Sequence, residues 1–427
     1  MRKRMLLVAA IFVLAVSTAN AKTIVKNELI VPKQPDTYLE VRHIVLAGTN
    51  QEIGKALADI GKEWLDVKLM PYESPLYAQA RRAYMAKNYP ILLERMKGVA
   101  KSFGLAPNTD KFATNQLLFD VGGFGCSALF LSPAATANGH ALLAHNMDFY
   151  TITMAEMNGL KPAPGDHGLF SRDFVIELYP DKGYPSIVIG TFDLLNGLQS
   201  GMNSQGLVVA IHVDHDAPVN KAVSDKGDNF SGLNMIQIAR LILDTCATAE
   251  QAKVVILNNK IAAGFLPCHI MVSDRAGKSF IFETSGQDFS SHLTDNSGKP
   301  QIMTNHPVYK YPDPDKFPAY SPKATYNTFY RYRALDNFVK NHPEKFSRDD
   351  LKKAISLVYA HTHDMDEGAS LPSPCRTLFN EVYDLTDLSV EAKFYLKDGP
   401  TDPNTGDPTL VFTAPFKFKL DTNKKSK

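Results

Sequence analysis

The sequence predicts an α+β fold in which two antiparallel sheets lie face to face between layers of helices, a four-layer αββα sandwich. Three observations support this prediction. Helical patterns dominate up to residue 125, strand-like runs follow in pairs after residue 126, and pairs of helical patterns separate the groups of strands. We therefore expect a single domain built from two segments, residues 22–125 and residues 126–427.

The first segment is expected to be mainly helical. Residues 41–46 form an apolar run that favours a strand. Thr49 and Glu52 then form a capping box, and apolar residues recur behind it at helical spacing as far as Val67. Two further helices are expected, at residues 77–88 and 90–104.

The second segment alternates between strands and helices. Short apolar runs predict its strands, at residues 128–131, 141–144, 174–179, 186–190, 207–211, 269–273, 280–283, 377–385, 391–396, 409–413 and 416–420. Patterns of helical period predict helices at residues 233–243, after the capping box of Thr248 and Gln251, and at residues 326–340 and 348–360. Loops are expected at residues 150–172, 285–300 and 307–322.

Charge and hydropathy exclude two classes of partner. Lys and Arg number 46 and Asp and Glu 45, so there is no basic excess that would attract a nucleic acid. The apolar run at residues 5–16 is too short to span a bilayer, and no integral membrane segment is expected.

The N-terminal residues have the features of an export signal. Basic residues 2–4 precede the apolar run at residues 5–16, and Ala19 and Ala21 follow it. The pattern predicts a signal peptide at residues 1–21 and a secreted or periplasmic protein.

The stretch GGFGCSALFL at residues 122–131 predicts a self-cleaving junction between Gly125 and Cys126. Glycine permits a strained backbone and lets the thiol reach the preceding carbonyl carbon. An N-to-S acyl shift followed by hydrolysis would leave Cys126 at the start of a new chain. Its thiol, with an unperturbed pKa of about 8.5, is the nucleophile, and its α-amine, at about 7.7–8.0, is a general base.

A hairpin is expected to bring Asp148 back to this junction. The run at residues 128–131 predicts a buried strand, Asn138-Gly139 predicts a turn, and residues 141–144 predict the returning strand. The plain alternative is that Cys126 is a buried apolar cysteine within a strand, because free cysteine is among the most buried residue types.

The order of motifs resembles the N-terminal-nucleophile (Ntn) hydrolases, and within them the acyl-coenzyme A:6-aminopenicillanic-acid acyltransferase family. Choloylglycine hydrolases and acid-ceramidase-like amidases are its relatives. The resemblance rests on a series of motifs in family order: residues 48–54 (GTNQEIG), 125–128 (GCSA), 146–148 (NMD), 201–207 (GMNSQGL), 303–307 (MTNHP) and 376–384 (RTLFNEVYD). It implies the αββα fold of the Ntn hydrolases.

The resemblance also implies roles for individual residues. Asp148 would hold the Cys126 amine and tune its basicity, and Asn203 would steady the reacting carbonyl or that amine. Asn305 would donate a hydrogen bond to the oxyanion, an interaction of about 3–4 kcal/mol in comparable enzymes. Arg376 would stabilise the thiolate. Each also has an ordinary alternative, as a turn aspartate, a turn cap, a loop residue or a surface cation.

Two departures from the bile-salt branch concern the positive charge near the thiol. That branch has an arginine three residues before the aspartate, where this chain has His145, which is charged only when protonated. Its other arginine lies on a helix that would correspond to Arg331 or Arg333 here. We prefer Arg376 to these two.

Two histidine clusters raise the question of a metal site. Residues 212–216 (HVDHD) and 361–364 (HTHD) place histidines at strand-like spacing. Because no His-Glu-x-x-His motif occurs, we expect loop histidines, no metal and no cofactor. Cys246, Cys268 and Cys375 form no Cys-x-x-Cys pair and allow at most one disulfide if the junction cysteine stays free.

The predicted function is that of an exported cysteine Ntn-hydrolase, an amidase for N-acyl amines or N-acyl amino acids that works through an acyl-thioester. Its small-molecule substrate would carry a linear amide bond. Transfer of the acyl group to an amine would instead make it an acyltransferase. Three other hypotheses stay open: a phospholipase-B-like or ceramidase-like lipid hydrolase, a secreted binding protein that has lost the chemistry, and a metal-dependent hydrolase.

Overall fold

The structure is a computed structural model, and it describes residues 23–119, 125–218, 231–264, 266–319, 327–361 and 375–424. Three parts of the prediction lie outside these ranges: the signal peptide at residues 1–21, the glycine-containing residues 122–124 before the junction, and residues 362–364 of the second histidine cluster. Within the described ranges, no helix combines the length and the apolar composition that a bilayer-spanning segment requires.

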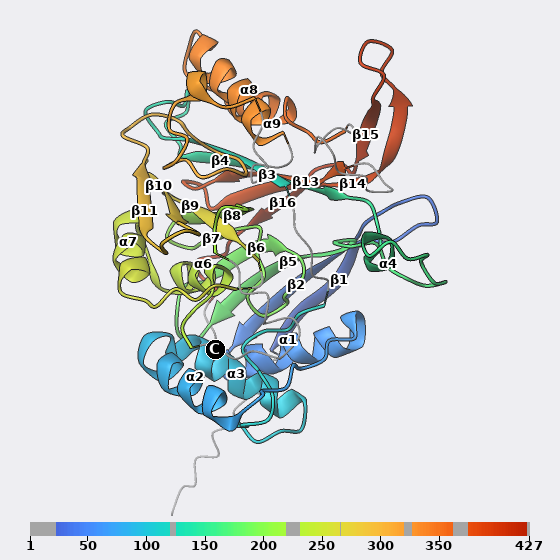
Figure 1. The fold of residues 1–427 in the computed structure, drawn as a ribbon, viewed down its shortest axis with the longest axis vertical. Helices are drawn as coiled ribbons and strands as arrows, with labels where there is room; N and C mark the ends of the chain where they lie inside the picture. The colour runs from blue at the N-terminus through green and yellow to red at the C-terminus, as the bar shows by residue number, and fades with distance from the viewer. Residues whose placement is uncertain are drawn as a thin grey trace, which may run out of the picture.

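Two β-sheets stacked face to face form the centre of the molecule (Figure 1). Among the described residues, the larger sheet has nine strands, which lie in the spatial order β1 (Ile24–Val31), β2 (Glu40–Gly48), β5 (Arg172–Pro180), β6 (Ser186–Gly190), β7 (Ser200–Asn203), β8 (Leu207–Val213), β9 (Cys268–Asp274), β10 (Ser279–Thr284) and β11 (Ser291–Asp295). Its neighbouring strands are antiparallel except for β2 and β5, which are parallel.

The smaller sheet carries the predicted junction. Its seven described strands are β12 (Gln301–Met303), β3 (Gly125–Leu131), β4 (Leu142–Tyr150), β13 (Cys375–Asp384), β14 (Ser389–Thr401) and β15 (Pro408–Phe412) in spatial order, with β16 (Phe416–Lys419) also paired to β14. All of these pairs are antiparallel. The predicted hairpin is therefore present as β3 and β4.

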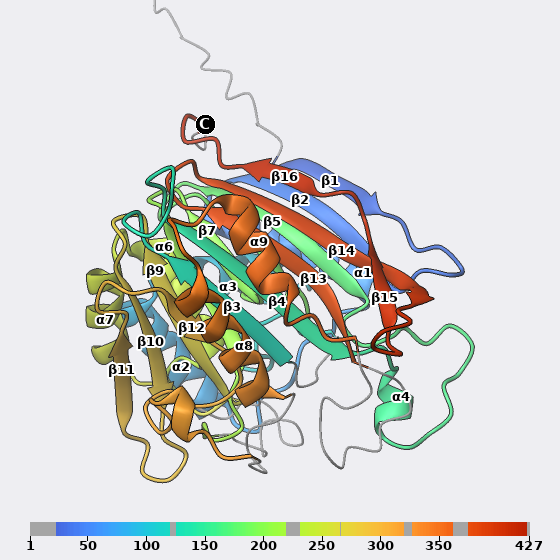
Figure 2. The same ribbon diagram turned by 90° about the horizontal axis from the view of Figure 1, so that it is seen from above.

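Helices cover the outer face of each sheet and complete the four predicted layers (Figures 1 and 2). On the nine-stranded sheet lie α1 (Asn50–Leu65), α6 (Met235–Thr245) and α7 (Ala249–Leu257), with α3 (Pro90–Ser102) packed on α1 and α2 (Pro75–Asn88) packed on α3. On the seven-stranded sheet lie α8 (Thr328–Asn341) and α9 (Arg348–Ser356). The short helix α4 (Met154–Met157) and the 3-10 helix η1 (Pro314–Lys316) lie in connecting loops.

The contact between α1 and α3 depends on two glycines. A Cβ atom on Gly54 would lie 2.1 Å from the Arg95 carbonyl oxygen, and a Cβ atom on Gly98 would lie 2.0 Å from the Gln51 carbonyl oxygen. Such distances are far inside van der Waals contact, so neither helix can approach the other with a larger residue at these positions. The predicted capping box of Thr49 and Glu52 is present at the start of α1.

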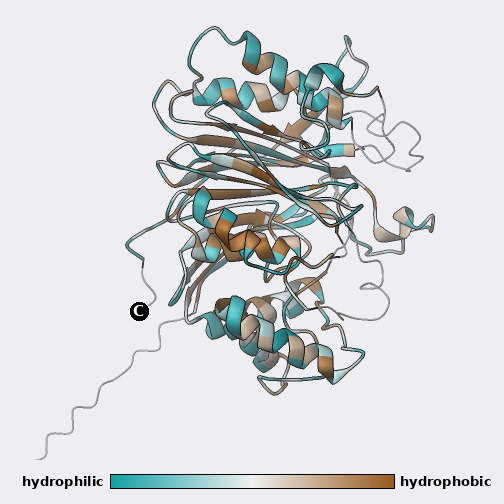
Figure 3. Ribbon diagram, turned by 60° about the vertical axis from the view of Figure 1, so that its left-hand side comes forward, coloured by the Kyte–Doolittle hydropathy of each residue, from teal (hydrophilic) through white to brown (hydrophobic). Residues whose placement is uncertain are grey.

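The main core lies between the two sheets, where brown apolar strands face each other in Figure 3. β3 is buried on both faces. Cys126, Ala128 and Phe130 point into the space between the sheets, whereas Leu129 and Leu131 point towards α8 and α9 and belong to a second, smaller cluster. This alternation follows from the two-residue period of a strand.

The structure contains four strands that the sequence did not predict: β1, β7, β11 and β12. β7 has the sequence SGMN and β11 has SHLTD, and neither carries an apolar run. Their pairing comes from the neighbouring strands, which present unpaired backbone groups to them. The first segment consequently contains two strands before its helices, β1 and β2.

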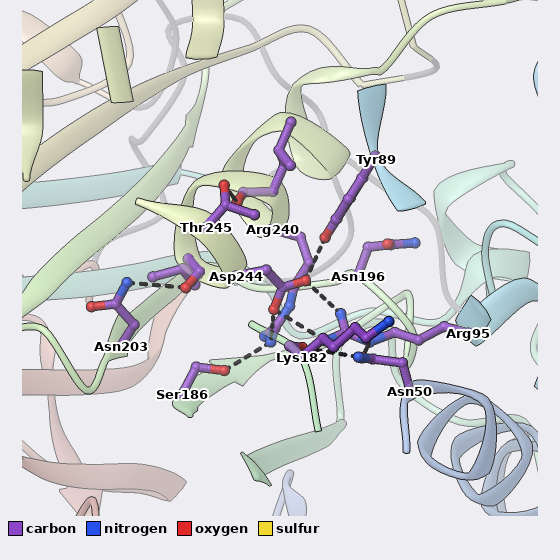
Figure 4. Close-up of polar contacts among 12 residues, drawn as sticks. Asn50, Tyr89, Arg95, Lys182, Ser186, Asn196, Asn203, Arg240, Asp244 and Thr245 are labelled. Atoms are coloured by element: carbon purple, nitrogen blue, oxygen red, sulfur yellow. Dashed lines mark hydrogen bonds and ion pairs between the residues drawn. The ribbon is translucent and has the colours of Figure 1, made fainter. Parts of the chain in front are cut away.

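A buried cluster of charges joins α3 to α6, and Figure 4 shows it from close range. We call it the Asp244 cluster. Asp244 accepts hydrogen bonds from Arg95 at 2.7 and 3.1 Å, from Arg240 at 2.7 Å and from the Tyr89 hydroxyl at 2.6 Å. Burial by itself raises the pKa of Asp244, but the two guanidinium groups outweigh it and hold the pKa below its usual range.

Replacing Asp244 by Asn is expected to lower the free energy of unfolding by about 3–5 kcal/mol, because two buried guanidinium groups lose their compensating charge. Glu94→Gln, next to Arg95 on α3, is the matched control. It removes a partly exposed pair with Lys97 and should cost less than about 1 kcal/mol. Equilibrium denaturation followed by circular dichroism measures both, and equal costs would contradict the structural role of the Asp244 cluster.

Candidate active site

β3 places Cys126 at the start of a fully buried strand, directly after Gly125. In the hairpin, Gly125 lies opposite Asp148 and Cys126 lies opposite Met147. Cys126 and Met147 therefore point into the space between the sheets, while Asp148 points to the opposite face, towards the layer of α8 and α9. Asp148 lies beside the predicted cleavage junction, on the other side of the sheet from the thiol.

The backbone nitrogen of Cys126 is held by Asn305, which follows β12. This N–H donates to Asn305 Oδ1 at 2.8 Å. Asn305 is itself fixed, because its Nδ2 donates to the Val213 carbonyl oxygen at 2.7 Å and its backbone N–H donates to Thr328 Oγ1 at 2.7 Å. Asn305 was predicted to donate to an oxyanion, but in this structure its oxygen faces Cys126 and its amide nitrogen is used elsewhere.

Arg331 of α8 is the arginine that reaches the junction. Its Nη1 donates to the Cys126 carbonyl oxygen and, at 2.8 Å, to Ser127 Oγ. Its Nη2 donates to Asn305 Oδ1 at 2.7 Å. Since Asn305 Oδ1 receives two N–H groups, the orientation of this carboxamide is defined by its partners.

The preference for Arg376 is corrected by these contacts. Arg376 lies on β13 and forms a bidentate ion pair with Asp398, at 2.6 and 2.8 Å, and also donates to the Cys375 carbonyl oxygen. Arg333 donates to two carbonyl oxygens of the η1 region, those of Pro314 and Phe317. Of the three candidate arginines, only Arg331 has hydrogen bonds to Cys126.

Asp148 is a buried carboxyl group with one hydrogen bond. Thr377 Oγ1 donates to Asp148 Oδ1 at 2.5 Å, and Asp148 Oδ2 has no hydrogen-bond partner among the described residues. Burial raises the pKa of Asp148 to about 6, although Arg331, Thr377 and His145 each lower it. The group is therefore poised to change its charge close to neutral pH.

Asn203 is used for structure in the turn between β7 and β8. Its Nδ2 donates to the carbonyl oxygens of Leu243 and Cys246, at 3.0 and 2.7 Å, and its Oδ1 accepts from the backbone N–H groups of Gln205 and Leu207. Figure 4 shows this side chain directed at α6. Asn203 thus satisfies carbonyl groups that the end of α6 leaves unpaired, a different use from the predicted role at the reacting carbonyl.

A buried histidine next to the thiol is held by a carboxylate. His145 Nδ1 lies 2.8 Å from Glu381 Oε2, and Ser200 Oγ donates to Glu381 Oε1 at 2.9 Å. The sequence marked His145 only as the position where related enzymes have arginine, and Glu381 was not singled out. Their pairing follows from register, because Glu381 of β13 lies directly opposite His145 of β4.

Two further histidines continue this polar row into the nine-stranded sheet. His212 Nδ1 lies 3.0 Å from the Thr304 carbonyl oxygen, and the ring of His212 is 5.2 Å from that of His145 and 5.9 Å from that of His269, between centroids. Burial, with the neighbouring histidines, lowers the pKa of His212 well below its usual range. His212 is therefore neutral, and the predicted HVDHD cluster contributes one histidine to this site.

The Cys126 thiol is protonated in this environment. Burial raises its pKa well above the usual range and the Asp148 carboxylate adds to this, whereas Arg331 acts in the opposite direction. A base must therefore take the proton before the sulfur can attack a carbonyl carbon. All four cysteines of the chain are free and buried, so the disulfide that the sequence allowed is not formed.

Residues 135–395, more than half of the chain, match the family model described as acyl-coenzyme A:6-aminopenicillanic acid acyl-transferase. This match begins nine residues after Cys126 and includes Asp148, Asn305 and Arg331. A search of curated proteins gave no significant match.

Solved structures with a similar fold include two enzymes. A mutant of the conjugated bile acid hydrolase from Clostridium perfringens is 15% identical, with 69% of this chain and 97% of that chain covered and a TM-score of 0.45. Penicillin V acylase from Agrobacterium tumefaciens is 16% identical, with 70% and 87% covered and a TM-score of 0.42.

Asp148→Asn is expected to stabilise the protein at neutral pH and to change little in acid. The pKa of Asp148 is about 6 in the folded chain and about 3.9 in an unfolded one. Between these values the folded chain binds more protons, so this carboxyl group lowers the free energy of unfolding as the pH rises. The difference between these two pKa values corresponds to at most about 3 kcal/mol.

Urea denaturation of wild type and Asp148→Asn at about pH 4 and about pH 7.5 measures this difference. The asparagine retains an oxygen that can accept from Thr377, so a packing change is not expected. A variant that is less stable than wild type at the higher pH would contradict the raised pKa of Asp148.

Proposed function

The chain belongs to the acyl-coenzyme A:6-aminopenicillanic acid acyl-transferase family, which comprises Ntn-type acyltransferases and amide hydrolases, and from this we propose that it is an amidase with Cys126 as its nucleophile. The single observation that carries the proposal is the way Cys126 is held. Asn305 fixes its nitrogen and Arg331 its carbonyl oxygen, while the thiol lies on the inner face of β3. An ordinary core cysteine needs none of these contacts.

Self-cleavage is the first proposed reaction. The thiol proton passes to a base, the sulfur bonds to the Gly125 carbonyl carbon, and the bond from that carbon to the Cys126 nitrogen breaks as the nitrogen takes a proton. Water then hydrolyses the thioester, which releases the Gly125 carboxylate and restores the thiol. Arg331 and Asn305, which already hold the C=O and N–H groups of Cys126, would keep the new terminus in place.

Amide hydrolysis follows the same steps on a substrate. The new α-amine takes the thiol proton, the sulfur attacks the acyl carbon, and the amine returns the proton to the leaving nitrogen. Asn305 Oδ1, 2.8 Å from the Cys126 nitrogen, is placed to orient that amine. Asp148, with its raised pKa, is the nearby carboxyl group that would respond to the charge on the amine.

A cavity near the candidate site has a lining of mixed character, which suits an N-acyl amine or N-acyl amino acid. Its volume is about 180 Å³, and its lining combines apolar side chains such as Met235 and Leu266 with polar ones such as Asn259 and Thr284, and includes Cys268. Cys268 lies close enough to Cys126 to contribute to the raised pKa of its thiol. Because the N-terminal residues 1–21 have the pattern of a signal peptide, we propose export, where acyl-coenzyme A is scarce and water is the acceptor.

The intact mass of the purified, denatured protein tests self-cleavage. Wild type is expected to give two pieces, the larger one beginning at Cys126, and Cys126→Ala is expected to stay whole. Cys246→Ala is the control, because Cys246 is another buried free cysteine, and it should be cleaved like wild type. If folded wild type stays whole, the nucleophile proposal fails and a binding protein of the same fold becomes the better hypothesis.

Arg331→Gln is expected to slow self-cleavage by about a hundredfold or more, because its guanidinium holds the Cys126 carbonyl oxygen and Asn305 together. Arg376→Gln is the matched control, since its charge is paired with Asp398 instead. Mass spectrometry of samples taken over time gives both rates. If Arg376→Gln were the slower of the two, the assignment of the arginine would be reversed.

A further inference from the structure

Two buried imidazole rings lie beside the Cys126 thiol in the space between the sheets. His145 comes from β4 of the seven-stranded sheet and His212 from β8 of the nine-stranded sheet. The Cys126 sulfur and one nitrogen of each ring all lie within 4.8 Å of one another. All three side chains are fully buried.

The hydrogen bonds decide which nitrogen of each ring can bind a further group. His212 Nδ1 faces the carbonyl oxygen of Thr304, which can only accept, so this nitrogen carries the proton. His145 Nδ1 faces the Glu381 carboxylate and carries a proton for the same reason. In the neutral form of either ring the lone pair is then on Nε2, and neither Nε2 has a hydrogen-bond partner among the described residues.

The thiol satisfies at most one of these two lone pairs. An S–H group donates once, so the second imidazole nitrogen stays unpaired, and a buried unpaired acceptor destabilises the folded chain. A divalent cation that displaces the thiol proton would instead bind the sulfur and both nitrogens together.

We propose that Cys126 Sγ, His145 Nε2 and His212 Nε2 form a binding site for a divalent cation of the zinc class. Thiolate with imidazole is the donor set that favours Zn²⁺ over Mg²⁺ or Ca²⁺. Glu381 and the Thr304 carbonyl orient the two rings, as outer partners do for histidines that bind zinc. With bonds of about 2.0–2.3 Å, three tetrahedral donors lie about 3.3–3.6 Å apart, so small side-chain movements complete the site.

In two other clusters of histidine and acidic residues in the described ranges, possible ligand atoms are already used in hydrogen bonds. In the set of Asp214, His269 and Glu283, both nitrogens of His269 are hydrogen-bonded, to Glu283 at 3.0 Å and to the Thr304 carbonyl oxygen at 2.8 Å. In the set around His140, Asp384 accepts from the ring and from two backbone N–H groups. Only the set of Cys126, His145 and His212 therefore offers buried imidazole nitrogens without hydrogen-bond partners among the described residues.

Binding of the cation has a defined chemical consequence. The thiol proton leaves to solvent, one per ion, and the sulfur becomes a metal ligand. A sulfur held in this way is not available for attack on a carbonyl carbon, so the ion inhibits self-cleavage and turnover. This inhibitory consequence rests on the proposed function, whereas the metal site itself does not.

Titration of the purified, metal-free protein with Co²⁺ tests the site without an activity measurement. We expect one Co²⁺ per chain and a thiolate-to-cobalt charge-transfer band. His145→Gln and His212→Gln should each weaken binding at least about tenfold, and Cys126→Ala should lose the band. His43→Gln is the matched control, because His43 is also buried and paired with a glutamate, Glu177. It should bind Co²⁺ like wild type.

The wild-type titration shows whether the chain binds Co²⁺ through a thiolate, even if a variant fails to fold. Absence of the charge-transfer band from wild type, or its persistence in Cys126→Ala or in both histidine variants, would overturn the proposal. One equivalent of Zn²⁺ should then slow self-cleavage of wild type at least about tenfold, with recovery on chelation. If Co²⁺ binds as expected but Zn²⁺ leaves cleavage unchanged, the inhibitory role is wrong; if the chain never cleaves, the proposed function fails while the cobalt result stands.

Discussion

The arrangement at the junction depends on one buried guanidinium group, that of Arg331. A buried charge is tolerated only where hydrogen bonds replace its water, and Arg331 obtains them from the Cys126 carbonyl oxygen, Ser127 and Asn305. These partners belong to β3 and to the segment after β12, while Arg331 belongs to α8. The charge therefore joins the outer helical layer to the sheet at the residue proposed to react, and the position of α8 fixes the geometry there.

The second feature of the site is a polar row inside an otherwise apolar core. Glu381 and His145 belong to the seven-stranded sheet, and the Thr304 carbonyl oxygen directly follows its strand β12, whereas His212 belongs to the nine-stranded sheet. Most facing residues of the two sheets are aliphatic or aromatic, which gives the row few alternative partners. Low local polarity strengthens each hydrogen bond and makes each unpaired nitrogen more costly. The stacking of the two sheets thus brings a nucleophile and two nitrogen bases together without any loop.

Sequence reasoning predicted the layers of the fold and the hairpin, because capping boxes, turn residues and apolar runs are local signals. It also brought Asp148 back to the junction, and the resemblance singled out Asn305, although for a bond to the oxyanion and not for the bond to the Cys126 nitrogen. It preferred Arg376 to Arg331 because it had no means to dock α8 on β3, a contact between residues 205 positions apart in the chain. The same limit applies to Asn203: a turn asparagine is visible in the sequence, but its bonds to the end of α6 are tertiary.

The register of the hairpin determines both the packing of the core and the face of the sheet on which Cys126 lies. β3 is buried on both faces and Ser127 is its one polar side chain, so a slip of one residue would exchange Cys126 for Ser127 and leave the leucines buried. Polar pairs between β4 and β13 remove this ambiguity. His145 lies opposite Glu381 on the inner face, and Asn146 lies opposite Asn380 on the outer face, where Asn380 Nδ2 donates to Asn146 Oδ1 at 2.8 Å.

A slip of one position would leave all four of these buried side chains without their partners, at a cost of about 1–3 kcal/mol for each unsatisfied group. No comparable cost acts on the leucines of β3, which are buried in either register. The polar residues of the core thus fix the register of β4 against β13, and the pairing of β4 with β3 then fixes the register of β3. The face on which the Cys126 thiol lies is decided by these hydrogen bonds between β4 and β13 together with the bond from Arg331 to Ser127 Oγ.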